Sequence, residues 1–180
     1  MKTGVTGYFD LEGSKRMTLR VHYEEAYDPT TAKRTVAITK LQLKAEWYPA
    51  VYYPDGTVTI DGITAVTMDA GRGTHNVNAS PTNEFRDMNG EMGSVSDIGS
   101  NDDGSKSITI SVSVHGYTKD GEGSGNGWSV QGSQTIVLTK IHRGLVYFGD
   151  EAYQLYIDNV TDWELHGPQI ANGSTWNLFS

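Results

Sequence analysis

Apolar and polar residues alternate along several stretches of the chain, and a period of two is the pattern of half-buried β-strands. Residues 17–23 alternate without a break, and residues 35–45 form a second stretch of the same kind. The apolar positions of the second stretch change parity near residues 39–40, which predicts a β-bulge or burial of both strand faces. We therefore expect two strands here, of which the second is irregular.

Further short strands separated by turn signals follow. Ile and Val alternate with Thr and Ser over residues 108–114, and residues 128–138 form the last strand of this part. Pro-Asp-Gly at 54–56, Asp-Gly at 61–62 and Asn-Asp-Asp-Gly at 101–104 are typical turn sequences. No helical period of useful length is present. Seven or eight short strands at this spacing predict an all-β fold of the β-sandwich type.

The chain divides into three predicted parts. Residues 16–140 hold the strands of the sandwich, and residues 69–99 are expected to be a long loop region with one or two short strands. Residues 1–15 are expected to form an N-terminal arm, because their glycines suggest a segment that could reach a neighbouring chain. Residues 141–180 form a separate tail.

The tail contains three copies of one small pattern, at residues 147–155, 157–165 and 170–178. Each copy has an apolar or aromatic residue, a polar turn, an aromatic residue six positions on, and a Leu two positions further. Because residues two apart share a face of a strand, each aromatic and its Leu point to one side. One such unit is too small to bury its own apolar face, so the repeats favour assembly with neighbouring units or chains. The pairs are Tyr153 and Leu155, Trp163 and Leu165, and Trp176 and Leu178.

Composition narrows the possible functions. The chain has no Cys, which excludes disulfides, thiolate metal sites and a thiol nucleophile. Its 14 basic and 22 acidic residues give a formal net charge of -8, which disfavours nucleic acid as a partner because phosphate binding depends on Lys and Arg. No apolar run reaches membrane-spanning length, so neither membrane insertion nor a readable signal segment is expected.

No constellation of residues indicates catalysis, a metal or a cofactor, and we expect a protein that is not an enzyme. Glu24 and Glu25 are neighbours on a strand and face opposite sides, so they cannot flank one bond together. Residues 101–104 offer too few oxygen atoms for calcium and are better interpreted as a turn. The histidines lack metal-ligand spacing, and His22 and His115 fall on polar strand positions, where exposure is expected.

A cluster of aromatic residues is the best candidate for binding outside the tail. Proline residues flank Trp47, Tyr52 and Tyr53, which places this segment at a sheet edge or in a loop. Packing in the core or between subunits is the first interpretation of these aromatics, and contact with a glycan is the second. Trp128 follows a Gly-rich loop at residues 120–127 and is a further candidate for a binding rim.

Three segments resemble the tail and other virion structural proteins of siphophages that infect Gram-positive, gut-type hosts. They are the paired stretches at residues 19–28 and 36–44, the Asp-Gly-Ser-Lys element with its alternating strand at residues 103–114, and the tail repeats. The sequence departs from the usual repeat at Val160, where Gly is common, and at Ala171, where Asp is common. The resemblance implies an immunoglobulin-like sandwich in a protein of the virion, made in the cytoplasm of the bacterial host.

The expected function is therefore a non-enzymatic role in the phage tail or its tip, in assembly and as a candidate for host attachment. The expected partners are further copies of the chain and other virion proteins, with a host cell-surface glycan as an additional candidate. Decoration of the capsid and a carbohydrate-binding module are the alternatives. A tail-associated hydrolase is a third hypothesis, which would need an acidic pair within residues 69–99.

Overall fold

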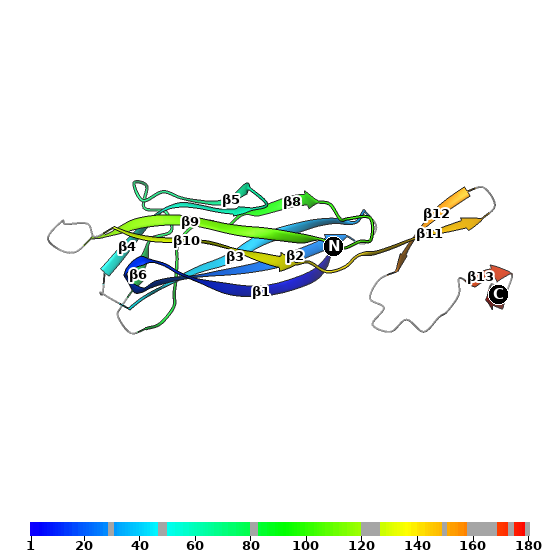
Figure 1. Ribbon diagram of the computed structural model, residues 1–180, viewed down its shortest axis with the longest axis horizontal. Helices are drawn as coiled ribbons and strands as arrows, with labels where there is room; N and C mark the ends of the chain where they lie inside the picture. Colours follow the sequence, from blue (N-terminus) through cyan, green and yellow to red (C-terminus); the bar gives the residue numbers. More distant parts are fainter. Residues whose placement is uncertain are drawn as a thin grey trace.

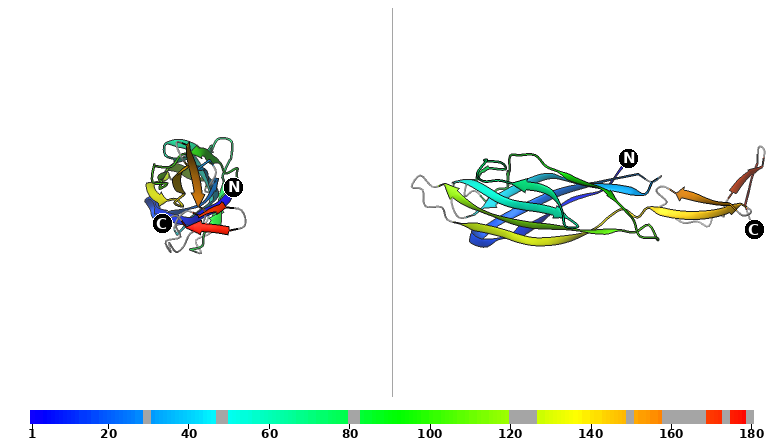
Figure 2. Two further views of the ribbon diagram at one scale, coloured as in Figure 1. Left: turned by 90° about the vertical axis from the view of Figure 1, so that its right-hand side faces the viewer. Right: turned by 90° about the horizontal axis from the view of Figure 1, so that it is seen from above.

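The computed structural model describes residues 1–28, 31–46, 50–79, 83–119, 127–148, 151–157, 169–172 and 175–178. Within these ranges the chain is almost entirely β-strand, and most strands belong to two antiparallel sheets (Figure 1). The strands of both sheets run roughly along the long axis of this body (Figure 2). The all-β sandwich predicted from the alternation is confirmed.

The first sheet contains the N-terminal strands in chain order. A 3-10 turn, η1 (Ser14–Arg16), connects its first two strands. The order is β1 (Lys2–Glu12), β2 (Met17–Asp28) and β3 (Lys33–Ala45), and the outer side of β3 pairs with both β7 (Arg86–Asp87) and β8 (Ser94–Ile98).

The second sheet combines the middle of the chain with its later strands. Its order is β10 (Trp128–Val137), β9 (Ser107–Lys119), β4 (Ala50–Ile60) and β5 (Ile63–Met68), with β6 (Val77–Ala79) also paired to β4. Both β3–β8 and β4–β9 pair strands that are distant in the sequence, as in the Greek-key connections of β-sandwiches.

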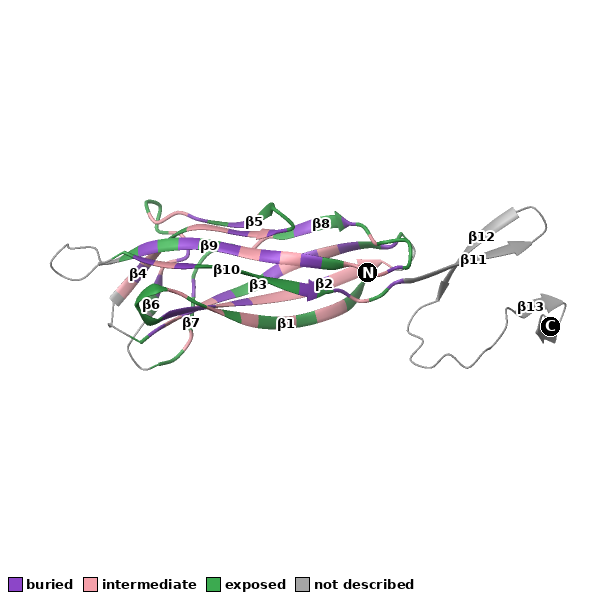
Figure 3. Cartoon of the chain, in the orientation of Figure 1, coloured by how far each residue is buried: buried purple, intermediate pink, exposed green. Residues whose placement is uncertain are grey.

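The core follows directly from the period-two pattern. Buried and less buried positions alternate along the central strands, as Figure 3 shows for β9. Aliphatic side chains from both sheets meet between the layers, and burial of their apolar area is the main favourable term in folding. The core residues with no exposed area are Leu19, Val21, Val36, Leu41, Leu43, Ala45, Val58, Ile60, Ile110, Val114 and Val130.

The parity change in β3 is a β-bulge, as the sequence predicted. His22 of β2 pairs with Lys40, whereas the next residue, Tyr23, pairs with Ile38. Thr39 is therefore the extra residue of β3. The bulge lets the apolar residues on both sides of it face the same core despite their different parity.

Residues 1–15 differ from the prediction of a separate arm, because β1 is an edge strand of the sandwich. It pairs with β2 from Lys2 opposite Tyr27 to Glu12 opposite Thr18. None of its residues is fully buried. An edge strand covered on one side gives a weak hydrophobic pattern, so the glycines, which suggest an arm, are the stronger local signal.

The turn predicted at residues 54–56 is also wrong, because these residues lie inside β4. Beyond its pairing with β9, β4 pairs with β6 up to Tyr52 and with β5 from Gly56 onward. Pro54 falls in the gap between these two partners, where its missing N–H is tolerated. Gly56 has a φ of 140°, and a Cβ there would lie 2.1 Å from the Ser113 carbonyl oxygen. Pro54 and Gly56 therefore lie within an irregular central strand and not in a turn.

The other two predicted turns are present. Asp61 and Gly62 connect β4 to β5 with φ values of 48° and 80°, as a tight hairpin requires. In the turn at residues 101–104, the Gly104 N–H donates to the Asn101 carbonyl at 2.9 Å. Hydrogen bonds from Ser105 lower the pKa of Asp103 in this turn.

The boundary between sandwich and tail lies one residue later than predicted. Ile141 is buried, and its N–H donates to the Gly104 carbonyl at 3.0 Å. The tail then forms two hairpins, which do not pair with either sheet of the sandwich in the described part of the chain. Their strands are β11 (His142–Phe148) and β12 (Glu151–Ile157), then β13 (Gln169–Asn172) and β14 (Thr175–Leu178).

Glu25 and Arg34 form a fully buried ion pair near the β2–β3 turn. The Arg34 Nε donates to the Glu25 carboxylate at 3.0 Å, and neither side chain has any exposed area. The other oxygen of Glu25 accepts the backbone N–H groups of Val5 at 3.1 Å and Thr139 at 2.9 Å. All three contacts satisfy a carboxylate that would otherwise be costly to bury.

The remaining N–H groups of Arg34 donate hydrogen bonds to segments that are far away in the sequence. It donates to the carbonyl oxygens of Gly104 at 3.0 Å and Thr139 at 2.8 Å, and also to the Ser100 hydroxyl. The bulge in β1 belongs to the same arrangement, because Gly4 and Val5 together face Glu25. A Cβ on Gly4 would lie 2.2 Å from the Glu25 carboxylate, so only glycine allows this approach.

Replacing Arg34 with Ala should destabilise the sandwich by about 3–5 kcal/mol, because it leaves a buried carboxylate without its partner. The measurement is urea unfolding followed by circular dichroism. Lys33→Ala is the matched control, since the neighbouring Lys33 pairs with Asp97 at 2.8 Å on the exposed surface, where ion pairs contribute little. Equal unfolding midpoints for the two variants would contradict the structural role of the buried pair.

Candidate binding and assembly surfaces

Two of the predicted contact aromatics belong to the core. Tyr52 of β4 is 1% exposed and Trp128 of β10 is 3% exposed, with their rings edge to face at a centroid distance of 6.2 Å. Gly116 lies beneath the indole, where a Cβ would come within 2.7 Å of the ring. Burial raises the pKa of the Tyr52 hydroxyl. The prediction that Trp128 lines a binding rim is therefore wrong, and packing in the core, the first interpretation of Tyr52, is correct.

Tyr53 is the predicted aromatic that the structure places at the surface. It pairs with Tyr117 of β9, and the two rings stack at 5.1 Å with an interplanar angle of 13°. Tyr117 is 42% exposed. The next pair on this face is Asp55 opposite His115, whose side chains are exposed and 4.0 Å apart. This outer face of the second sheet combines stacked rings with polar groups.

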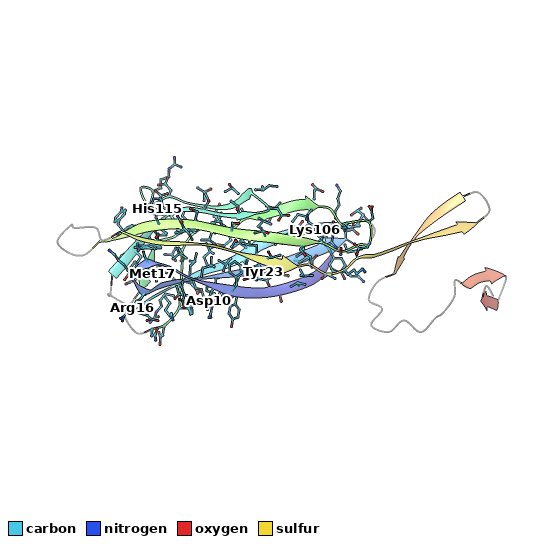
Figure 4. All side chains as sticks on the ribbon, in the orientation of Figure 1. Asp10, Arg16, Met17, Tyr23, Lys106 and His115 are labelled. Atoms are coloured by element: carbon cyan, nitrogen blue, oxygen red, sulfur yellow. The ribbon has the colours of Figure 1, made fainter. Side chains whose placement is uncertain are left out.

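The outer face of the first sheet carries a second aromatic cluster, which the sequence did not indicate. The Arg20 guanidinium lies 4.2 Å from the Tyr8 ring centroid and 3.8 Å from that of Phe85. It also donates twice to Asp10, at 2.7 and 2.8 Å, and this hydrogen bonding lowers the pKa of Asp10. Figure 4 shows Asp10 on β1 and His115 on β9, which belong to different sheets. Because Asp10 already neutralises Arg20, the cluster is not a free cationic site.

The tail residues divide between described and undescribed positions. Tyr153 and Leu155 lie on β12, and Trp176 and Leu178 lie on β14. Trp163 and Leu165 of the second repeat lie outside the described residues, as does Trp47.

The first and third repeats both fold as hairpins, with their strands separated by residues 149–150 and 173–174. The position of the aromatic differs between the two hairpins. Tyr153 is the third residue of β12 and pairs with Val146, whereas Trp176 is the second residue of β14 and pairs with Ala171. The aromatic and the Leu nevertheless lie on the second strand in each case, two residues apart.

The sequence reasoning missed the three most buried polar residues of the described part of the chain, namely Glu25, Arg34 and His75. The period-two alternation of the strands indicates that Glu25 and Arg34 are buried. Glu25 has the inward parity of Leu19 and Val21, and Arg34 has that of Val36. A charged residue at an inward strand position predicts a buried partner. His75 lies between strands, where no period marks its burial.

The described part of the chain shows no group of three His, Asp or Glu side chains placed to hold a metal ion. It also has no helix of the length and hydropathy needed to cross a bilayer. No protein-family model, curated protein or solved structure matches the chain.

Trp128→Ala should destabilise the protein by about 3–5 kcal/mol because it opens a cavity between the sheets. Tyr117→Ala removes an exposed stacked ring and should cost about 1 kcal/mol. Urea unfolding monitored by far-ultraviolet circular dichroism compares the two variants. If Trp128→Ala were as stable as Tyr117→Ala, the indole could not be a core residue.

Proposed function

We propose that the protein is a non-enzymatic structural component of a bacteriophage virion, in the tail or its tip, and that it assembles through its C-terminal hairpins. The segments that resemble phage virion proteins fall on β2 and β3, on the turn leading into β9, and on the tail. The observation that carries the proposal is the pair of tail hairpins, whose described strands pair with neither sheet of the sandwich.

A hairpin of two strands is marginally stable in water by itself, and stability usually needs a third strand or a packed layer. The described residues of the tail form two such hairpins, β11–β12 and β13–β14. In the first and third repeats the aromatic and the Leu lie two positions apart on the second strand, and positions two apart share a face of a strand. We infer that neighbouring copies, or other virion proteins, supply the missing layer.

The point where the tail begins suits this role. The Thr139 N–H and C=O both bond to the buried ion pair, and Ile141 is buried. The chain therefore leaves the sandwich from a position fixed to its core. Such an arrangement lets a rigid sandwich carry a separate assembly element.

The full chain should be a discrete oligomer, whereas a chain ending at Ile141 should be monomeric with an unchanged unfolding midpoint. Light scattering coupled to size exclusion gives the mass of each. Trp163→Ala with Trp176→Ala should weaken assembly in the full chain, because it removes two of the repeated aromatics. Tyr117→Ala, on the sandwich surface, is the control. A monomeric full chain would refute assembly through the tail.

The virion assignment needs a separate measurement. Purified particles of the phage that encodes this chain should contain it in a fixed stoichiometric ratio to the known structural proteins, measured by mass spectrometry. Gold-labelled antibodies should mark the tail, and labelling of the capsid instead would favour a decoration role. Absence from washed particles would rule out a virion component even if the purified protein self-associates.

A further inference from the structure

A cleft of about 620 Å³ opens at the side of the sandwich where β5 faces the segment that precedes β8. One wall is the β5 stretch of residues 65–67, and the other is residues 89–93. Residues 73–75 of the loop after β5 close one end. The volume lies in the range of pockets that bind small molecules.

Backbone contacts hold the walls of this cleft in place. The Gly93 carbonyl accepts the Ile38 N–H at 2.9 Å, and the Asn89 N–H donates to the Asn76 carbonyl at 3.2 Å. In the loop, the Asp69 N–H donates to the Thr74 hydroxyl at 2.8 Å. Both walls and the end are thus tied to the sandwich or to each other, which makes the cleft preformed.

His75 is the buried polar group of the cleft, at 3% exposure. Its Nε2 lies 3.0 Å from the Glu91 carbonyl oxygen. A carbonyl only accepts, so Nε2 must carry the proton of the bond. Gly90, at a φ of 118°, packs on the same ring edge, where a Cβ would lie 2.7 Å from Nε2. In the tautomer with the proton on Nε2, the ring presents Nδ1 as an acceptor.

This acceptor is unused within the described part of the chain. The His75 Nδ1 is buried and has no hydrogen-bond partner there, and the same holds for the Oδ1 atom of the adjacent Asn76. Buried polar atoms are normally paired. Of these two residues only His75 lines the cleft, so its Nδ1 is the acceptor for which a bound molecule would supply a donor, directly or through one water.

The charges around the cleft narrow the class of ligand. No Lys or Arg is among its lining residues, and Glu91 is the one charged residue there. An anion would find no cationic partner. The rest of the lining mixes small polar groups, Thr67, Thr74 and Asn89, with the apolar side chain of Met92. This mixture suits a molecule with both hydroxyl groups and C–H faces.

We propose that the cleft binds a neutral, hydroxyl-rich ligand of the size of a sugar residue, with a ligand hydroxyl donating toward the His75 Nδ1. A peptide strand added to the β5 edge is less suitable. A Cβ on Gly93 would lie 2.0 Å from the Ala65 carbonyl oxygen, so the wall already covers the strand edge at this point. The site lies in the sandwich and does not depend on the virion assignment.

The test uses the full chain, labelled with ¹⁵N, and nuclear magnetic resonance titrations with glucose, galactose, rhamnose and N-acetylglucosamine at millimolar concentration. Inorganic phosphate is the anionic probe. At least one sugar should cause saturable shifts of the Gly73, Gly90 and Gly93 amides, and should move the His75 Nδ1 resonance in the direction of a hydrogen-bonded nitrogen. Phosphate should cause neither change.

Thr67→Trp should fill the cleft from its exposed rim, and should weaken sugar binding at least about tenfold, or 1.4 kcal/mol. Thr135→Trp, at an exposed position of β10, is the matched control and should bind normally. His75→Phe should also lose binding, provided that its unfolding midpoint shows a folded protein.

Several outcomes would overturn the proposal. They are an absence of saturable shifts with every sugar, phosphate binding in the cleft in place of sugar, and equal sugar binding by Thr67→Trp and the parent chain. A Nδ1 resonance that is already hydrogen-bonded in the free protein and unchanged by sugar would assign the atom to a buried water alone. Loss of binding in Tyr117→Ala would place the sugar on the stacked tyrosines instead.

Discussion

The buried pair of Glu25 and Arg34 is the interaction on which the order of this sandwich depends. It connects the bulge of β1, the β2–β3 hairpin, the 99–104 loop and the segment after β10. Its longest hydrogen bond in sequence joins Glu25 to Thr139, 114 positions away. A buried ion pair is not necessarily more stabilising than an apolar replacement. Its strongest effect is on specificity, because each buried charge is satisfied only when all these segments are correctly placed.

This constraint relates the fold to the proposed function. Thr139 bonds to both members of the pair, as acceptor from Arg34 and as donor to Glu25. The last residues of the sandwich are therefore held by its most constrained contacts, although they lie next to hairpins that share no strand with it. A force or a partner acting on the tail would act on the ion pair, rather than on a loosely attached strand end.

The fold was largely predictable because period two is a direct consequence of strand geometry. The alternation predicted the strands, and the change in its parity predicted the bulge that lies at Thr39. Two local signals, a Pro and a Gly, predicted a turn that is not present. Pro54 and Gly56 are usual in turns, but here Pro54 lies in a gap between β5 and β6 on one side of β4, and Gly56 is the first residue of β4 that pairs with β5.

The candidate sites were harder to predict, for different physical reasons. Parity alone separates Tyr52, which faces inward with Val58, from Tyr53, which faces outward, so the core role of Tyr52 was readable. His75 was not. It has a φ of 61° in a loop whose shape depends on glycines with positive φ, and contacts between distant backbone segments leave no periodic trace in the sequence.

Charge sets a limit on how the tail can associate. Residues 142–180 contain five acidic residues and a single basic one, Arg143, and the whole chain is also acidic. Bringing tails together therefore brings like charges together, and apolar burial must exceed this repulsion. In the repeat pattern, the positions that can bury apolar area are separate from the positions that carry charge. The apolar positions alternate along the strands, whereas the carboxylates fall in or beside the polar turns, at Asp150, Asp158 and Asp162. An interface that packs the aromatic and Leu positions can leave these carboxylates in water, where salt screens their repulsion over about 8 Å at physiological ionic strength.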